Sequence, residues 1–149
     1  MKYYLSYGSN LHLQSMAMRC KNAKVVGKSE IKDHKLVFKG TCDGRAYLTL
    51  EKAKGSSVPV AIYKISFFDE CALDKYECYP FLYFKSKEKI EINGKKKSAM
   101  FYIMRENFGY HVPSEAYLEV CLEGYTDFGF DKKHLVNALK TTIRNLQID

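Results

Sequence analysis

The segment KYYLSYGSN, residues 2–10, decides the fold that we expect for this 149-residue chain. Residues 2–7 form a short aromatic run, which predicts a first strand, and Gly8-Ser9-Asn10 ends that strand in a tight loop. A helix should follow, because Ser9 or Asn10 can cap it. Its apolar positions recur at roughly helical spacing: Leu11, Leu13, Met16, Ala17 and Cys20. The chain is therefore expected to open as strand, loop and helix.

The loop at Tyr7-Gly8-Ser9-Asn10 is the most distinctive local signal. A glycine after a strand, followed by small polar residues, presents free backbone N–H groups that can hold a carboxylate or a phosphate. The alternative is an ordinary strand-to-helix turn, since neither complete glycine-rich phosphate motif is present. The local pattern alone favours that alternative.

The middle of the chain predicts a β-rich region. Strand-like segments at 35–39, 46–50 and 58–65 are separated by turn signals at Gly40, at Asp43-Gly44 and at 55–57. A helix should follow with Asp69 as its cap and should end near Glu77, before Pro80.

The remaining residues predict a hairpin and two helices. Residues 83–92 and 98–104 flank Asn93-Gly94, the strongest short hairpin signal. Ser114 can cap a helix that stops at Gly124, and Asp131 can cap a last helix. The apolar stripe of that last helix is expected to be Leu135, Leu139, Ile143 and Leu146. We therefore expect one α+β domain over residues 1–149.

Composition sets broad limits on function. The formal charge of +7 suits an anionic ligand, a nucleic acid or an acidic membrane surface, but net charge does not name a partner. The five cysteines form no C-x-x-C pair, so we expect reduced thiols and no metal site. The N-terminal residues do not resemble a secretory signal, and no apolar run is long enough to span a bilayer, so we expect a cytoplasmic protein.

Three chemical features have ordinary alternatives. Glu77 stands near Tyr76 and Tyr79, where burial would raise the pKa of its carboxyl group, but an exposed glutamate at a helix end is the simpler interpretation. The lysines of the predicted hairpin, from Lys85 to Lys97, suit nucleic acid, but a solvated sheet edge protected by lysines is favoured. Cys78 is expected to pack rather than to react, because a neighbouring carboxylate weakens a thiol as a nucleophile.

Taken in chain order, four groups of residues resemble a known family. These are YGSNL at 7–11, then Met16 and Arg19, then LDxxE at 73–77, then PSxxY at 113–117. The chain resembles the γ-glutamylcyclotransferase superfamily, and more closely its small bacterial AIG2-like members, from the first strand to about Phe130. Two positions depart from the family pattern, in which glycine is common where this chain has Cys78 and Ala61.

The resemblance implies a small mixed β-barrel with flanking helices, a pocket at its mouth, and no metal or organic cofactor. It implies transferase or lyase chemistry that converts a γ-glutamyl amino acid or amine to 5-oxoproline and the free amine. Glu77 would be the general acid and base. The expected substrate-binding residues are Tyr7, Gly8, Ser9, Asn10, Leu11, Tyr83, Tyr102 and Tyr117.

The expected partner is thus a small γ-glutamyl molecule, with no nucleic acid and no membrane, in a monomer or weak homodimer. The leaving amine stays open among an amino acid, an amine, Cys-Gly and an antibiotic intermediate. The alternative function is a pocket protein that binds a γ-glutamyl or carboxylate metabolite without turnover.

Overall fold

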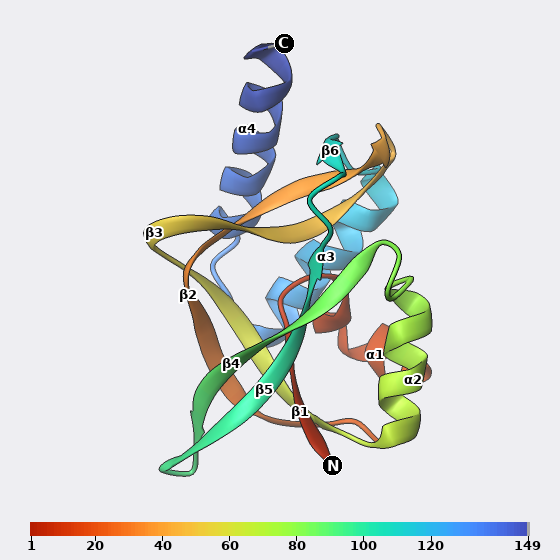
Figure 1. Cartoon of the computed structure of the whole chain (residues 1–149), viewed down its shortest axis with the longest axis vertical. Coiled ribbons are helices and arrows are strands. Elements are labelled where there is room, and N and C mark those ends of the chain that lie inside the picture. The colour runs from red at the N-terminus through yellow and green to blue at the C-terminus, as the bar shows by residue number, and fades with distance from the viewer. Residues whose placement is uncertain (149) are drawn as a thin grey trace.

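A computed structural model describes residues 1–148 of the chain and shows one curled, mixed β-sheet with helices around it (Figure 1). The strand order is β4-β5-β1-β3-β2-β6. The strands are β1 (Lys2–Ser6), β2 (Lys24–Cys42), β3 (Arg45–Ile65), β4 (Tyr83–Ile92), β5 (Lys95–Met104) and β6 (Gly109–Tyr110). Strand β1 runs parallel to β5, and the other pairs are antiparallel. The predicted α+β class is confirmed, and the barrel takes the form of a curled half-barrel.

Short helices flank this sheet. They are the 3₁₀ turn η1 (Ser9–Leu11), α1 (Leu13–Arg19), α2 (Phe67–Tyr76), α3 (Glu115–Phe128) and α4 (Lys133–Ile148). Helices α1 and α2 lie together beside β1, and α4 extends away at the opposite end (Figure 1). No helix among the described residues is long and apolar enough to cross a membrane.

The predicted turn at 55–57 is wrong, because the chain bends there without reversing. Strands β2 and β3 stay paired on both sides, with Lys32 opposite Ser57 and His34 opposite Lys52. Gly55 has φ +84°, and its N–H donates to Asp33 Oδ1 at 3.0 Å across the bend. The single reversal between the two strands is at Asp43-Gly44, as predicted, whereas the turn predicted at Gly40 is wrong because Gly40 lies within β2 and pairs with Ala46.

Two helix caps differ from the prediction. Residues 9–11 form the separate turn η1, so α1 is capped by His12, whose Nδ1 accepts from the Ser15 N–H at 3.1 Å. Helix α2 is capped by Ser66, and Asp69 closes a capping box by accepting from the Ser66 N–H at 2.9 Å. Glu77 ends α2, as expected.

Gly124 does not stop α3, which continues to Phe128 and ends at Gly129 with φ +68°. Gly124 is needed for a different reason. A Cβ there would lie 2.8 Å from His12 N and from Leu11 C, so only glycine lets α3 pack against the loop that follows β1.

The stripe predicted for α4 is only partly right. Leu135 is buried, but its buried companions are Ala138 and Thr142, while Ile143 and Leu146 are exposed. Thr142 helps to set which face of α4 is turned toward the sheet, because its hydroxyl accepts from the Phe38 N–H at 3.0 Å and donates to the Ala138 carbonyl at 2.8 Å.

The hairpin prediction is confirmed. Asn93 and Gly94 both have positive φ, which fits a tight two-residue turn between β4 and β5. Strand β4 forms one edge of the sheet, and its Lys87 and Lys89 are exposed there. This matches the solvated, lysine-protected edge favoured from the sequence.

Candidate active site

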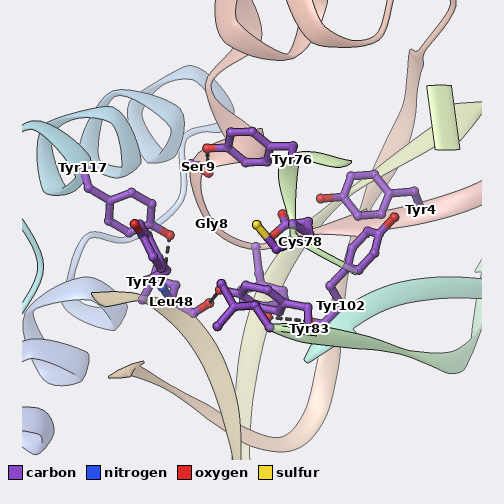
Figure 2. Close-up of a pocket in the computed structure, with 13 residues that line it drawn as sticks. Tyr4, Gly8, Ser9, Tyr47, Leu48, Tyr76, Cys78, Tyr83, Tyr102 and Tyr117 are labelled. Atoms are coloured by element: carbon purple, nitrogen blue, oxygen red, sulfur yellow. Dashed lines mark hydrogen bonds between the residues drawn. The ribbon is translucent and has the colours of Figure 1, made fainter. Parts of the chain in front are cut away.

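A cavity of about 210 Å³ opens where the loop after β1 meets the end of α2. Figure 2 shows Tyr47 and Tyr117 on one side of it and Tyr4 and Tyr102 on the other. Thirteen residues line the cavity: Tyr4, Tyr7, Gly8, Ser9, Tyr47, Leu48, Tyr76, Glu77, Cys78, Leu82, Tyr83, Tyr102 and Tyr117. Glu77 is the only carboxylic acid in this lining.

The structure brings most of the predicted site residues together. Seven of the nine line the cavity, namely Tyr7, Gly8, Ser9, Glu77, Tyr83, Tyr102 and Tyr117. Asn10 is buried behind the lining and donates from Nδ2 to Glu77 Oε1 at 3.3 Å. Leu11 lies in the core instead, and its N–H bonds to the Gly8 carbonyl at 3.0 Å.

Glu77 owes its position to the way α2 ends. Its N–H bonds to the Leu73 carbonyl at 2.8 Å, and its side chain is directed into the tyrosine-lined cavity. Burial raises the pKa of its carboxyl group to about 7, and the positive charge of Arg19 offsets part of that rise. At neutral pH this carboxyl group is therefore populated in both its protonated and ionised forms.

The tyrosine hydroxyls are oriented by the protein before any ligand arrives. Tyr7 donates to the Tyr102 carbonyl at 2.5 Å, and Tyr83 donates to the Leu48 carbonyl at 2.8 Å. Each of these hydroxyls has used its proton, so toward a ligand it is a hydrogen-bond acceptor. Tyr117 instead accepts from the Leu48 N–H at 3.0 Å, and that bond leaves its proton available. Burial raises the pKa of all three phenols, which keeps them neutral near pH 7.

Several residues in or beside this site were not predicted as site residues, and four of them make contacts that only the fold shows. Tyr4 accepts from Asn10 Nδ2 at 2.9 Å, and Tyr76 shares a hydrogen bond of 2.9 Å with Ser9. Asp74 accepts from the Tyr102 hydroxyl at 2.6 Å. Arg19 belongs to the family pattern, but only the fold shows that its guanidinium stacks over the Tyr76 ring at 3.4 Å.

Cys78 was expected to pack, and that expectation is wrong. The residue is exposed, contributes to the cavity lining and has φ +51°, a conformation that favours glycine. Cys78 therefore replaces the family glycine at a position whose positive φ favours glycine. Ala61, the other departure, lies buried in β3 opposite Ser6 and outside the cavity lining.

The arrangement is suited to proton transfer. One carboxyl group that titrates near neutrality faces neutral phenols and the backbone of Gly8 and Ser9. Within residues 1–148 we find no group of three or more His, Cys, Asp or Glu side chains placed to hold a metal ion.

Comparison with known proteins extends these observations. Residues 4–119 match the family model described as gamma-glutamyl cyclotransferase, AIG2-like. No curated protein matches the chain.

Solved structures share the fold at low sequence identity. A gamma-glutamyl cyclotransferase is 21% identical with a TM-score of 0.74, over 92% of this chain and 85% of its own. A Homo sapiens protein is 21% identical with a TM-score of 0.75, over the same shares of the two chains. YkqA from Bacillus subtilis is 17% identical with a TM-score of 0.66, over 84% of this chain and 48% of its own.

Proposed function

Because this chain belongs to the gamma-glutamyl cyclotransferase, AIG2-like family, we propose that it cyclises a γ-glutamyl amino acid or amine. The products are 5-oxoproline and the free amine, and the reaction uses no cofactor. The observation that carries the proposal is the placement of Glu77, the sole carboxyl group in the lining of a tyrosine-walled cavity. Burial raises its pKa to about 7, the range in which one group serves as both base and acid.

The reaction itself needs little beyond orientation and proton transfer. The α-amino group of a γ-glutamyl compound is tethered to its own γ-carbonyl carbon, so closure of the five-membered ring is intramolecular. A cavity that holds the chain folded back on itself therefore removes much of the entropic cost. The remaining obstacles are the proton on the ammonium group and the poor leaving ability of an amide nitrogen.

Glu77 addresses both obstacles in turn. In its ionised form it takes a proton from the α-ammonium group, and the freed amine attacks the γ-carbonyl carbon to form a tetrahedral oxyanion. Glu77 then returns the proton to the departing nitrogen as the oxyanion collapses and the original amide bond breaks. The ring nitrogen still carries two protons after its attack, and it passes one of them to the released amine, which leaves as an ammonium ion. The carboxylate is regenerated, so the enzyme is unchanged.

The cavity walls supply the orientation. The Tyr7 and Tyr83 oxygens are acceptors, since both protons are committed to backbone carbonyls, and they suit an ammonium or amide N–H of the substrate. Gly8 and Ser9 lie at the start of the 3₁₀ turn η1, where backbone N–H groups have no partners within the turn. These N–H groups suit a carboxylate or the developing oxyanion.

The test is release of 5-oxoproline, measured by mass spectrometry, from a panel of γ-glutamyl amino acids, dipeptides and amines. Wild-type protein is compared with Glu77→Gln, which keeps the shape of the side chain and removes its base. We expect product from at least one substrate and a loss of at least roughly a hundredfold in rate in the variant. Product formation that survives in folded Glu77→Gln would overturn the role of Glu77.

A folded wild-type protein that is stabilised by a γ-glutamyl compound but forms no 5-oxoproline would instead indicate a binding module. The same panel, followed by thermal unfolding, separates these outcomes and also identifies the leaving amine.

A further inference from the structure

Glu77 is connected through Asn10 to an arginine on a different helix. We infer that Arg19 is a positioning residue: by holding the Asn10 carboxamide, it fixes which oxygen of Glu77 is left to exchange a proton with the substrate. This inference rests on the proposed function, because it concerns the same carboxyl group.

The direction of the Asn10 amide follows from the chemistry of arginine. Arg19 Nη1 donates to Asn10 Oδ1, and a guanidinium group has donors only. The atom facing Arg19 must therefore be the amide oxygen, and the NH₂ group must face the other way. There it donates to Tyr4 Oη at 2.9 Å and to Glu77 Oε1 at 3.3 Å, which uses both of its protons.

Arg19 is itself held in place by the residue that precedes Glu77. Its guanidinium lies 3.4 Å from the centre of the Tyr76 ring, and the Tyr76 hydroxyl bonds to Ser9 Oγ at 2.9 Å. Helix α1 thereby ties the loop at Ser9-Asn10 to the end of α2 (Figure 2 shows Ser9 and Tyr76 in contact). A lysine keeps the charge but cannot stack a planar group and direct an N–H at the amide in the same way.

The two oxygens of Glu77 therefore have different roles. Oε1 is occupied by Asn10, whereas no side chain or backbone group of residues 1–148 hydrogen-bonds to Oε2. Oε2 is then the oxygen that takes and returns the proton. Without Arg19 the amide is free to flip, and its oxygen would then face Oε1 and repel the ionised carboxylate.

The other groups around Glu77 do not replace this contact. Those facing it from the packed elements are Tyr4 and Tyr7 from β1 and its loop, Tyr76 and Cys78 from the end of α2, Tyr83 from β4, Tyr102 from β5 and Tyr117 from α3. Asp74 is one step further away, behind Tyr102, and is paired with Lys85. In this surrounding Arg19 is the cation that lowers the pKa of Glu77, although no direct ion pair joins the two side chains among the described residues.

The experiment compares Arg19→Met, Arg19→Lys, Asn10→Ala and the double variant Arg19→Met/Asn10→Ala, using the substrate found active in the panel. Arg144→Met is the matched control, because Arg144 is exposed on α4 and its removal changes the net charge equally. For each variant kcat, KM and the pH dependence of kcat/KM are measured, and folding is checked by circular dichroism and thermal unfolding.

We expect Arg19→Met to lower kcat about tenfold with KM changed less than about threefold, and to move the pH inflection upward from about 7. Arg19→Lys should restore the inflection but only part of kcat. The double variant should be no slower than Asn10→Ala, because Arg19 acts through Asn10. A folded Arg19→Met or Arg19→Lys variant with wild-type kcat, or fully additive losses in the double variant, would overturn the inference.

One readout keeps the inference separate from the proposed function. The titration of the Glu77 carboxyl carbon, followed by NMR in the free protein, needs no turnover. If wild-type protein forms no 5-oxoproline, an upward shift of that midpoint in both Arg19→Met and Asn10→Ala, but not in Arg144→Met, still supports the positioning role. An unchanged midpoint in Arg19→Met refutes it.

Discussion

Helix α2 carries a carboxyl group near each end, and the protein treats the two in opposite ways. Glu70, in the first turn, is buried yet bonded to two lysines, with Lys2 and Lys85 both 2.9 Å from its carboxylate. Glu77, the residue that caps the C-terminal end, faces tyrosines and one amide. Burial acts to raise the pKa of both groups. At Glu70 the hydrogen bonds from the two lysines outweigh it and lower the pKa, whereas at Glu77 burial prevails.

The helix itself reinforces this contrast. Its N-terminal end carries partial positive charge, which favours an anion at Glu70, and its C-terminal end carries partial negative charge, which disfavours one at Glu77. Side chains also link Glu70 to the cavity lining, since Lys85 pairs with both Glu70 and Asp74, and Asp74 accepts from the Tyr102 hydroxyl. The comparison shows that burial raises the pKa of a carboxyl group on this helix where no lysine or arginine of the described residues forms a direct ion pair with it, and that two direct lysine partners reverse the shift.

The largest expected effect is that stability depends on pH between 5 and 8 through Glu77, at one end of α2, and not through Glu70, at the other. Glu77 has its pKa raised, so its contribution is complete below the usual value near 4.5 and is lost as the pH rises through about 7. As the pH rises from 5 to 8, the free energy of unfolding of Glu77→Gln relative to wild type should therefore increase by about 2–3 kcal/mol. Urea unfolding at both pH values measures this gain.

The matched variant is Glu70→Gln. The pKa of Glu70 is lowered, so its contribution is present above the usual value and is lost only as the pH falls through the lowered pKa. Glu70→Gln should be less stable than wild type at both pH 5 and pH 8, with little change between them. If the free energies of unfolding of the two variants changed with pH in the same way, the two carboxyl groups would not differ as described.

A smaller effect is expected when the lysine between the two ends is removed. Lys85 bonds to Glu70 at 2.9 Å and to Asp74 at 2.9 Å, so Lys85→Met leaves two carboxylates with one partner fewer each. We expect a loss of about 1–2 kcal/mol in the free energy of unfolding. Lys87→Met, on the same strand but exposed, should change it by less than about 0.5 kcal/mol. Equal losses in the two variants would show that the network around Lys85 adds nothing.

The smallest predicted effect concerns the residue after Glu77. Cys78 has φ +51°, so Cys78→Gly should relieve backbone strain and stabilise the fold by about 1 kcal/mol. Cys71 is also exposed but lies inside α2, where Cys71→Gly should destabilise it by about 0.5 kcal/mol. Thermal unfolding of both variants shows whether each substitution raises or lowers the stability. A destabilised Cys78→Gly would contradict the strain at this position.

Much of this architecture could be predicted because the deciding signals are local. The Asn93-Gly94 turn, the strand before Gly8 and the end of α2 at Glu77 depend on neighbours in the sequence. The predictions failed where distant residues set the outcome. Gly55 has the conformation of a turn residue, but pairing with β2 carries the strand through it, and Gly124 lies inside α3, where its missing Cβ leaves room for Leu11.

The same distinction holds for the site. Each local motif alone favoured an ordinary interpretation, and only the order of four motifs along the chain and the family they resemble led to the prediction of Glu77 and the loop at Gly8-Ser9, which the fold places in one cavity. The motifs did not predict that Asn10 would turn its amide toward Glu77, or that Arg19 would stack on Tyr76, since both contacts join separate helices. The opposite environments of Glu70 and Glu77 were hidden for the same reason, because both lysines of Glu70 come from strands distant in the chain.

The contact between Gly124 and the loop after β1 also limits how this site can be engineered. In a mutational library most positions on the outer helices should accept exchange, but position 124 will behave as an intolerant site although it lies outside the cavity. Any added side-chain atom there pushes on Leu11 and His12, which directly follow the loop that lines the cavity. Redesign of the loop for a new substrate must therefore treat α3 as part of the same unit.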